Sequence, residues 1–168
     1  MNEGLREPLR HSAWATQRLL AFCRDLSDEQ LAATAPGAYG SLLATLQHTV
    51  VAEGVFRAVL TGAFPDWNWR PDESPGLDVL EVRAMDNTRF WEAFLEQPFD
   101  PDRVCIQPGP HGRREASAGV VLAQVIEHAC EHRSQACSII TAQGLEPPDL
   151  QAWAYAYDVG LARDRPAT

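Results

Sequence analysis

Four long stretches of this chain place apolar side chains at intervals of three and four residues, with proline- and glycine-rich breaks between them. Apolar residues at that spacing share one face of an α-helix, which turns about 100° per residue. The stretches cover residues 5–24, 41–61, 77–97 and 117–142. Ser41 is a suitable N-cap for the second one. Four such helices in one domain favour an all-α four-helix bundle, with an up-down-down-up order of directions or a similar one.

The segments between these helices carry turn signals. Ser27 and Gln30 have the spacing of a capping box, which predicts a short helical turn after the first long helix. Residues 63–76 hold three prolines and two tryptophans and are expected to form a loop. Residues 102–116 are compatible with a short hairpin or an ordered loop, inserted before the fourth long helix. Residues 150–162 predict a short C-terminal helix.

Length and charge narrow the possible classes of protein. The 168 residues are most simply one domain, covering 1–168. A net charge of −9 argues against nucleic acid as the main partner, because phosphate binding depends on clustered basic side chains. Since no run of 18 apolar residues exists and the start lacks the apolar core of a signal peptide, we expect no membrane partner and a cytoplasmic location.

Two residue types limit the chemistry. All 14 basic residues are arginines, so no lysine is available for a Schiff base or a P-loop. The four cysteines form no C-x-x-C pair, which argues against a redox motif or a zinc knuckle. We expect them to be reduced thiols.

Three histidines are expected to point into the bundle. His128 and His132 lie four residues apart and share the apolar stripe of the fourth long helix, about 40° from each other. His48 lies in the middle of the apolar stripe of the second long helix. Three imidazoles from facing helices, with a fourth position open, are typical of a catalytic metal site. Of the other two histidines, His11 is expected at the surface or rim of the helix over residues 5–24. His111 is expected in a loop that lines a substrate entrance.

The residues around this pair allow a competing motif. The sequence HACEH fits H-x-x-E-H, the inverted zinc-peptidase pattern. That fold needs an acidic ligand well downstream on a much larger domain, whereas only 36 residues follow His132. Glu131 is nevertheless the one candidate catalytic residue, able to orient a metal ligand or move a proton. The alternative for Glu131 is an ordinary solvated helix glutamate.

Three segments resemble the DinB/YfiT-like family of bacterial metalloenzymes. They read LRHSAWATQRLLAFCRDLSDEQL, GSLLATLQHTVVAE and VIEHACEHRSQACSII. The last two are similar to the family patterns G-S-x-x-x-x-L-x-H-x-x-x-x-E and H-x-x-x-H-R-G-Q, with Ser134 in place of the glycine. The resemblance implies a four-helix bundle that holds one divalent metal ion, zinc or nickel, through His48, His128 and His132.

The resemblance also implies a function. Related proteins are transferases and isomerases that use a low-molecular-weight thiol such as mycothiol or bacillithiol. The first hypothesis is therefore a metal-dependent thiol S-transferase with a small-molecule substrate, in a homodimer by analogy. A metal-dependent hydrolase is one alternative, since the open position can also hold hydroxide. A non-catalytic, metal-stabilised stress-response or binding protein is the other.

The same helical periodicity predicts the places of four further side chains, those of Arg57, Arg133, Met85 and Trp91. Arg57 and Arg133 are expected at the surface, although either is able to meet an anionic substrate. Met85 is expected on the inner face of the third long helix, together with Trp91. For Trp67 and Trp69, in the loop after the second long helix, three alternatives stay open: lining of a pocket, a subunit interface, and packing in the bundle core.

Overall fold

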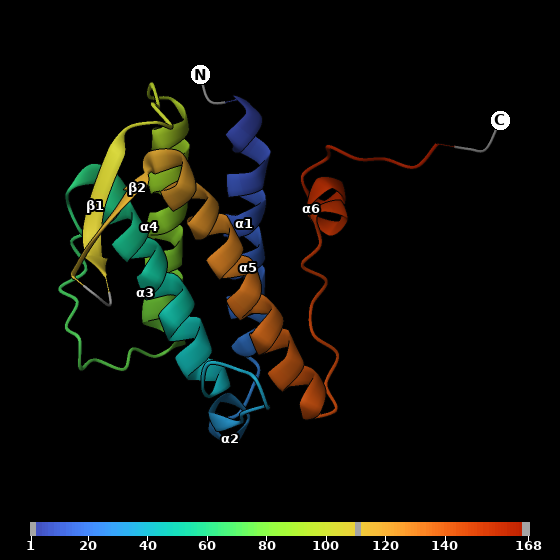
Figure 1. Cartoon of the computed structure of the whole chain (residues 1–168). Helices are drawn as coiled ribbons and strands as arrows, with labels where there is room; N and C mark the ends of the chain where they lie inside the picture. Colours follow the sequence, from blue (N-terminus) through green and yellow to red (C-terminus); the bar gives the residue numbers. More distant parts are fainter. Residues whose placement is uncertain (1–2, 110–111, 166–168) are drawn as a thin grey trace.

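Four long helices stand side by side in the computed structural model, which describes residues 3–109 and 112–165 (Figure 1). They are α1 (Glu3–Cys23), α3 (Leu42–Thr61), α4 (Leu77–Leu95) and α5 (Ala118–Ala142). In Figure 1, α1 and α5 run downward, whereas α3 and α4 run upward. α3 packs mainly on α5, and α1 mainly on α4. The predicted all-α bundle and its up-down-down-up order are confirmed.

Shorter elements join or follow the long helices within the described residues. They are α2 (Asp28–Ala32), β1 (Val104–Gly109), β2 (Gly112–Ser117) and α6 (Ala152–Asp158). β1 and β2 pair antiparallel, from Val104 opposite Ser117 to Gly109 opposite Gly112. The insertion before α5 is thus a hairpin, one of the two forms expected. His111 lies outside the described residues. No described helix has the length and apolar character needed to cross a membrane.

Side-chain caps account for the helix ends. Ser27 and Gln30 form the predicted capping box, each side chain accepting the backbone N–H of the other. The Ser41 hydroxyl accepts the Ala44 N–H at 3.1 Å and starts α3. Gly62 ends α3 with a φ of 85°, a conformation that glycine adopts without strain. The long helices therefore begin and end within two residues of their predicted bounds, while α6 is shorter than predicted.

Residues 62–76 cross the length of the bundle, because α3 and α4 run in the same direction (Figure 1). Trp67 fastens this crossover. Its indole N–H donates to Asp86 at 2.9 Å, and its carbonyl accepts from Arg83 at 3.2 Å. Its ring lies directly over Gly54 of α3, where a β-carbon would come within 2.8 Å. Trp67 thus has a structural role in holding the loop on the bundle.

The buried apolar side chains form two clusters, one toward each end of the bundle. The cluster near α2 includes Leu19, Leu20, Leu42, Leu46, Val50, Leu80, Ile139 and Ile140. The cluster near the hairpin includes Leu9, Leu60, Trp91, Leu95, Val121, Leu122 and Val125. Between them, every long helix contributes buried polar side chains. We call these the polar layer: Ser12, Thr16, Glu53, Arg57, Asn87 and Arg133.

Two arginines of the polar layer tie neighbouring helices together. Arg57 of α3 donates to Asn87 of α4 at 2.8 Å, and Asn87 donates back to the Val50 carbonyl at 3.3 Å. Arg133 of α5 donates to the hydroxyls of Ser12 and Thr16 on α1, both at 3.1 Å. These hydrogen bonds compensate in part for the removal of the guanidinium groups from water, and Arg57 Nε is left buried without a partner.

Three sequence-based placements were wrong. Arg57 and Arg133 are buried, with exposed fractions of 9% and 5%, and not at the surface. Each helix contacts more than one neighbour, so its buried face is wider than a single apolar stripe, and the long guanidinium side chains reach polar partners inside. Met85 is 49% exposed, because it lies about 100° around the helix from the buried Ala84. Trp91 is buried as predicted.

The close contact between Gly54 and Trp67 gives a first prediction. Gly54→Ala should lower the free energy of unfolding by about 1–2 kcal/mol, because the new methyl group would overlap the indole ring. That value is the net change, because the overlap costs more than the roughly 1 kcal/mol by which alanine stabilises a helix relative to glycine. Urea unfolding followed by tryptophan fluorescence measures the change. Gly4→Ala in α1, where a β-carbon meets nothing within 4 Å, is the control. Equal stability of the two variants would contradict the interpretation.

Candidate metal centre

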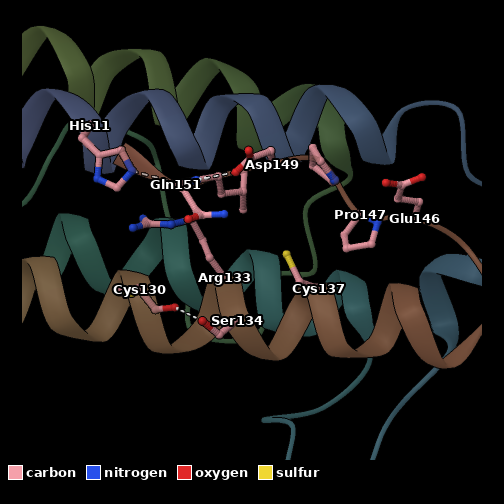
Figure 2. Close-up of a pocket in the computed structure, with 11 residues that line it drawn as sticks. His11, Cys130, Arg133, Ser134, Cys137, Glu146, Pro147, Asp149 and Gln151 are labelled. Carbon is pink, nitrogen blue, oxygen red and sulfur yellow. Dashed lines mark hydrogen bonds between the residues drawn. The ribbon is translucent and has the colours of Figure 1, made fainter. Parts of the chain in front are cut away.

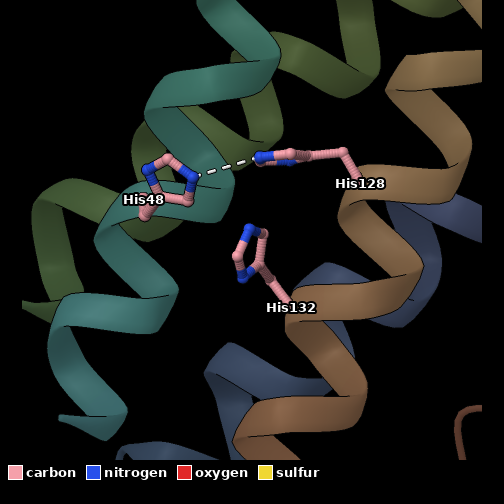
Figure 3. A group of neighbouring side chains, drawn as sticks. All are labelled: His48, His128 and His132. Carbon is pink, nitrogen blue, oxygen red and sulfur yellow. Dashed lines mark hydrogen bonds between the residues drawn. The ribbon is translucent and has the colours of Figure 1, made fainter. Parts of the chain in front are cut away.

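Three histidines meet between α3 and α5. His48 projects from α3, and His128 and His132 project from successive turns of α5 (Figure 3). One ring nitrogen from each histidine can be chosen so that all three lie within 4.8 Å of one another. The Nε2 atoms of His48 and His128 are 3.1 Å apart. The structure therefore brings together the three side chains that the sequence selected, and their binding of a metal stays a prediction.

Gln135 fixes the protonation of His132. The Gln135 side-chain oxygen lies 2.9 Å from His132 Nδ1 and also accepts the backbone N–H of Tyr39 at 3.0 Å. Because an amide oxygen only accepts hydrogen bonds, Nδ1 must carry the proton. The other nitrogen, Nε2, then has a free lone pair for a metal ion. Such orientation by an outer residue is usual for metal-binding histidines.

Aromatic rings wall the three imidazoles. The Tyr39 ring stacks on His48 with centroids 4.0 Å apart and meets His132 edge-on at 5.5 Å. Phe56 meets His128 edge-on at 5.4 Å. Tyr39 is 56% exposed, so it stands between the histidines and solvent. The sequence analysis missed this role of Tyr39, because Tyr39 lies in one of the proline- and glycine-rich breaks between the predicted helices.

The imidazoles are prepared to act as neutral ligands. Burial, reinforced by the neighbouring His132 and His48, lowers the pKa of His128 to about 4. Burial and His132 also lower the pKa of His48. Histidine binds a metal through the neutral ring, so little proton release is needed at neutral pH.

The donor set fits a metal ion of zinc type. Two nitrogens bound at about 2.0–2.1 Å in a tetrahedral site are roughly 3.3 Å apart, close to the 3.1 Å between His48 and His128. Among the described residues, no further His, Cys, Asp or Glu joins the three histidines in this group. Three protein ligands with one side open are the pattern of catalytic zinc sites.

The other candidates from the sequence lie outside this group. Glu131 is exposed, and its carboxylate accepts the Gln135 amide N–H at 3.3 Å. That position suits an orienting role, because Glu131 accepts a hydrogen bond from Gln135, and Gln135 in turn orients His132. The His11 ring nitrogen Nε2 lies 2.8 Å from the Leu150 carbonyl, on another side of α5.

Glu53 is a buried residue to which sequence reasoning gave no role. Burial raises the pKa of its carboxyl group, against the effect of a hydrogen bond from the Trp91 indole. The neighbouring Arg133 and Arg57 also oppose the rise in pKa. The sequence could have singled out Glu53, because it is the glutamate that ends the family pattern in the segment GSLLATLQHTVVAE, five residues after His48.

A small cavity adjoins the histidines on the hairpin side. It has a volume of about 60 Å³ and includes Phe56, which contacts His128, and Gln124, which lies one turn before it. Val121 and Arg114 also line it. None of the three histidines lines this cavity, and its volume suffices for a few water molecules.

Comparisons with known proteins identify the family and the fold of the chain. The model of the DinB family matches residues 1–160. The chain belongs to the DinB family. A crystal structure of a DinB-like protein from Bacillus cereus ATCC 10987 has the same fold, with a TM-score of 0.68 and 24% sequence identity. The match covers 88% of this chain and 96% of the other chain. Among curated protein sequences, none is similar enough to count as a relative.

The low pKa of His128 predicts how this DinB family protein responds to acid. In metal-free protein, the unfolded chain takes up the proton near its ordinary pKa of 6.5, whereas the folded chain resists it down to about 4. The free energy of unfolding should therefore fall as the pH drops through this window, by up to about 1.4 kcal/mol per pH unit. Urea titrations from pH 4 to pH 7 measure the slope. His128→Gln should flatten it, and an unchanged slope would contradict the assignment.

The contacts of Gln135 give a second prediction. Gln135→Ala should weaken zinc binding by about 10- to 100-fold, because His132 loses the acceptor that fixes its ring. Competition against a chromophoric chelator measures the dissociation constant. Gln124→Ala, an exposed glutamine on the same helix, is the matched control. Equal affinity in the two variants would show that Gln135 does not orient His132.

Proposed function

We propose that this DinB family protein binds one divalent metal ion, zinc or nickel, and transfers a low-molecular-weight thiol to an electrophilic small molecule. The observation that carries the proposal is the convergence of His48, His128 and His132 on one point with a side left open. Such an ion supplies Lewis acidity, which lowers the pKa of a thiol at the open position. The thiol sulfur would then form its bond to the electrophilic carbon as the bond from that carbon to the leaving group breaks, and the thiol proton would go to the leaving group or to solvent.

The protein's own residues prepare this chemistry. Gln135 holds the His132 ring in the tautomer that leaves Nε2 unprotonated. Tyr39 and Phe56 pack against the imidazoles and keep water from the rings they cover. Beside Phe56, Val121 offers an apolar surface and the exposed Arg114 offers a cation, which suits a substrate that has both an apolar part and an anionic part.

The first test is metal content. Untagged protein should contain about one zinc or nickel ion per chain by elemental mass spectrometry, and His48→Ala and His128→Ala should lose it. His11→Ala is the matched control, because His11 hydrogen-bonds to the Leu150 carbonyl and is not one of the three converging histidines. Absence of metal after reconstitution with both ions would overturn the proposal.

The second test is activity. Metal-loaded protein, given a low-molecular-weight thiol and a panel of electrophiles, should form a thioether at least about 100-fold faster than the His48→Ala variant. Turnover of esters or amides without any thiol would support the hydrolase alternative instead. Bound metal without either activity would point to the non-catalytic, metal-stabilised alternative.

A further inference from the structure

A second, larger cavity lies on the other side of α5 from the three histidines. It has a volume of about 690 Å³ and lies between α5, α1 and the segment 146–151 (Figure 2). α5 contributes Cys130, Arg133, Ser134 and Cys137 to its wall. These residues are roughly 120–180° around the helix from His128, so α5 separates this cavity from the candidate metal centre.

The outer wall of the cavity is held in place. The carbonyl of Leu150 lies 2.8 Å from the His11 ring nitrogen Nε2, and the Leu150 side chain packs against the apolar cluster near α2. Farther along, the buried Tyr155 of α6 donates its hydroxyl to Glu7 of α1 at 2.7 Å. The segment 146–151 is thus attached to α1 at Leu150, and the chain is attached to α1 again shortly after it, at Tyr155.

A buried cation faces this cavity. Arg133 is only 5% exposed, and the hydrogen bonds that its guanidinium makes to described residues all come from Nη1, to Ser12 and Thr16. Nε and Nη2 have no hydrogen-bond partner among the described residues. They are not fully buried either, because Arg57 Nε is the one side-chain atom of the described residues that is both fully buried and without a partner. The two free nitrogens of Arg133 are therefore reachable from the cavity that Arg133 lines.

The charge of Arg133 has no direct partner either. Within the described part of the chain, no carboxylate forms an ion pair with it, and Glu53 acts on it only through space. A buried charge is costly unless it is paired, and a planar guanidinium with two free donors matches a carboxylate. The other residues that line the cavity indicate which kind of anion it can bind. Pro147, Pro148 and Leu150 supply an apolar wall, whereas Glu146 and Asp149 would repel a second negative charge.

We propose that this cavity is a second ligand site, which binds a small molecule with one carboxylate group and an apolar body. The carboxylate pairs with Nε and Nη2 of Arg133, and the apolar body lies against Pro147, Pro148 and Leu150. The site involves none of the three histidines, so its occupancy is independent of the metal chemistry proposed above.

Cys130 provides a reporter for this site. It is an exposed, free thiol that lines the cavity, three residues before Arg133 on the same face of α5. The experiment measures the rate at which iodoacetamide alkylates Cys130, by mass spectrometry of peptides from metal-free, full-length protein. Hexanoate or the uncharged hexanamide is added at equal ionic strength. Hexanoate should slow alkylation of Cys130 by about fivefold when its concentration is several times its dissociation constant, and hexanamide should not.

Arg133→Met tests the anchor. The variant should lose the protection by hexanoate, while circular dichroism checks that it keeps its helical fold. Because Arg133 also joins α5 to α1, the result for the variant counts only if the variant folds. The comparison of hexanoate with hexanamide on the unsubstituted protein tests the proposal independently of the variant. Equal rates with the two additives would overturn the proposal, and so would full hexanoate protection in folded Arg133→Met.

Discussion

The two buried arginines of the polar layer set the geometry on which the rest of the molecule depends. A guanidinium group inside a bundle costs several kcal/mol unless hydrogen bonds satisfy it, so each arginine permits only arrangements in which its partners stay in reach. Arg57 joins α3 to α4, and Arg133 joins α5 to α1. A bundle with these two links resists sliding of one helix along another. Because the Arg10–Glu92 ion pair joins α1 to α4 in turn, these links run from α3 to α5 and keep His48 level with the two histidines of α5.

Much of this structure was predictable from the chain. The helices follow from apolar spacing, and their ends follow from serine caps and from Gly62. The convergence of His48, His128 and His132 follows from two helical faces that have to meet in a bundle. These features are local, or depend on a single rule of periodicity, and that is why the sequence alone suffices for them.

Other features depend on long-range contacts that periodicity does not contain. Arg57 and Arg133 have the character of surface residues in the sequence, and only their partners on other helices explain why they are buried. Tyr39 reaches the histidines because its backbone N–H bonds to Gln135, 96 residues later in the chain. The choice between hairpin and loop before α5 was likewise open, since turn residues suit both.

The three histidines have a topological consequence that is separate from any chemistry. His48 and His128 are 80 positions apart in the chain, and they lie on two helices that run in opposite directions. An ion held by both would act as a reversible cross-link that closes a loop of about that length. Unlike a disulfide, the ion would leave the unfolded chain, so it would stabilise the fold by an amount that grows with the concentration of free ion relative to its dissociation constant. Metal availability would then set the stability of the folded chain, as redox conditions do for proteins held by disulfides.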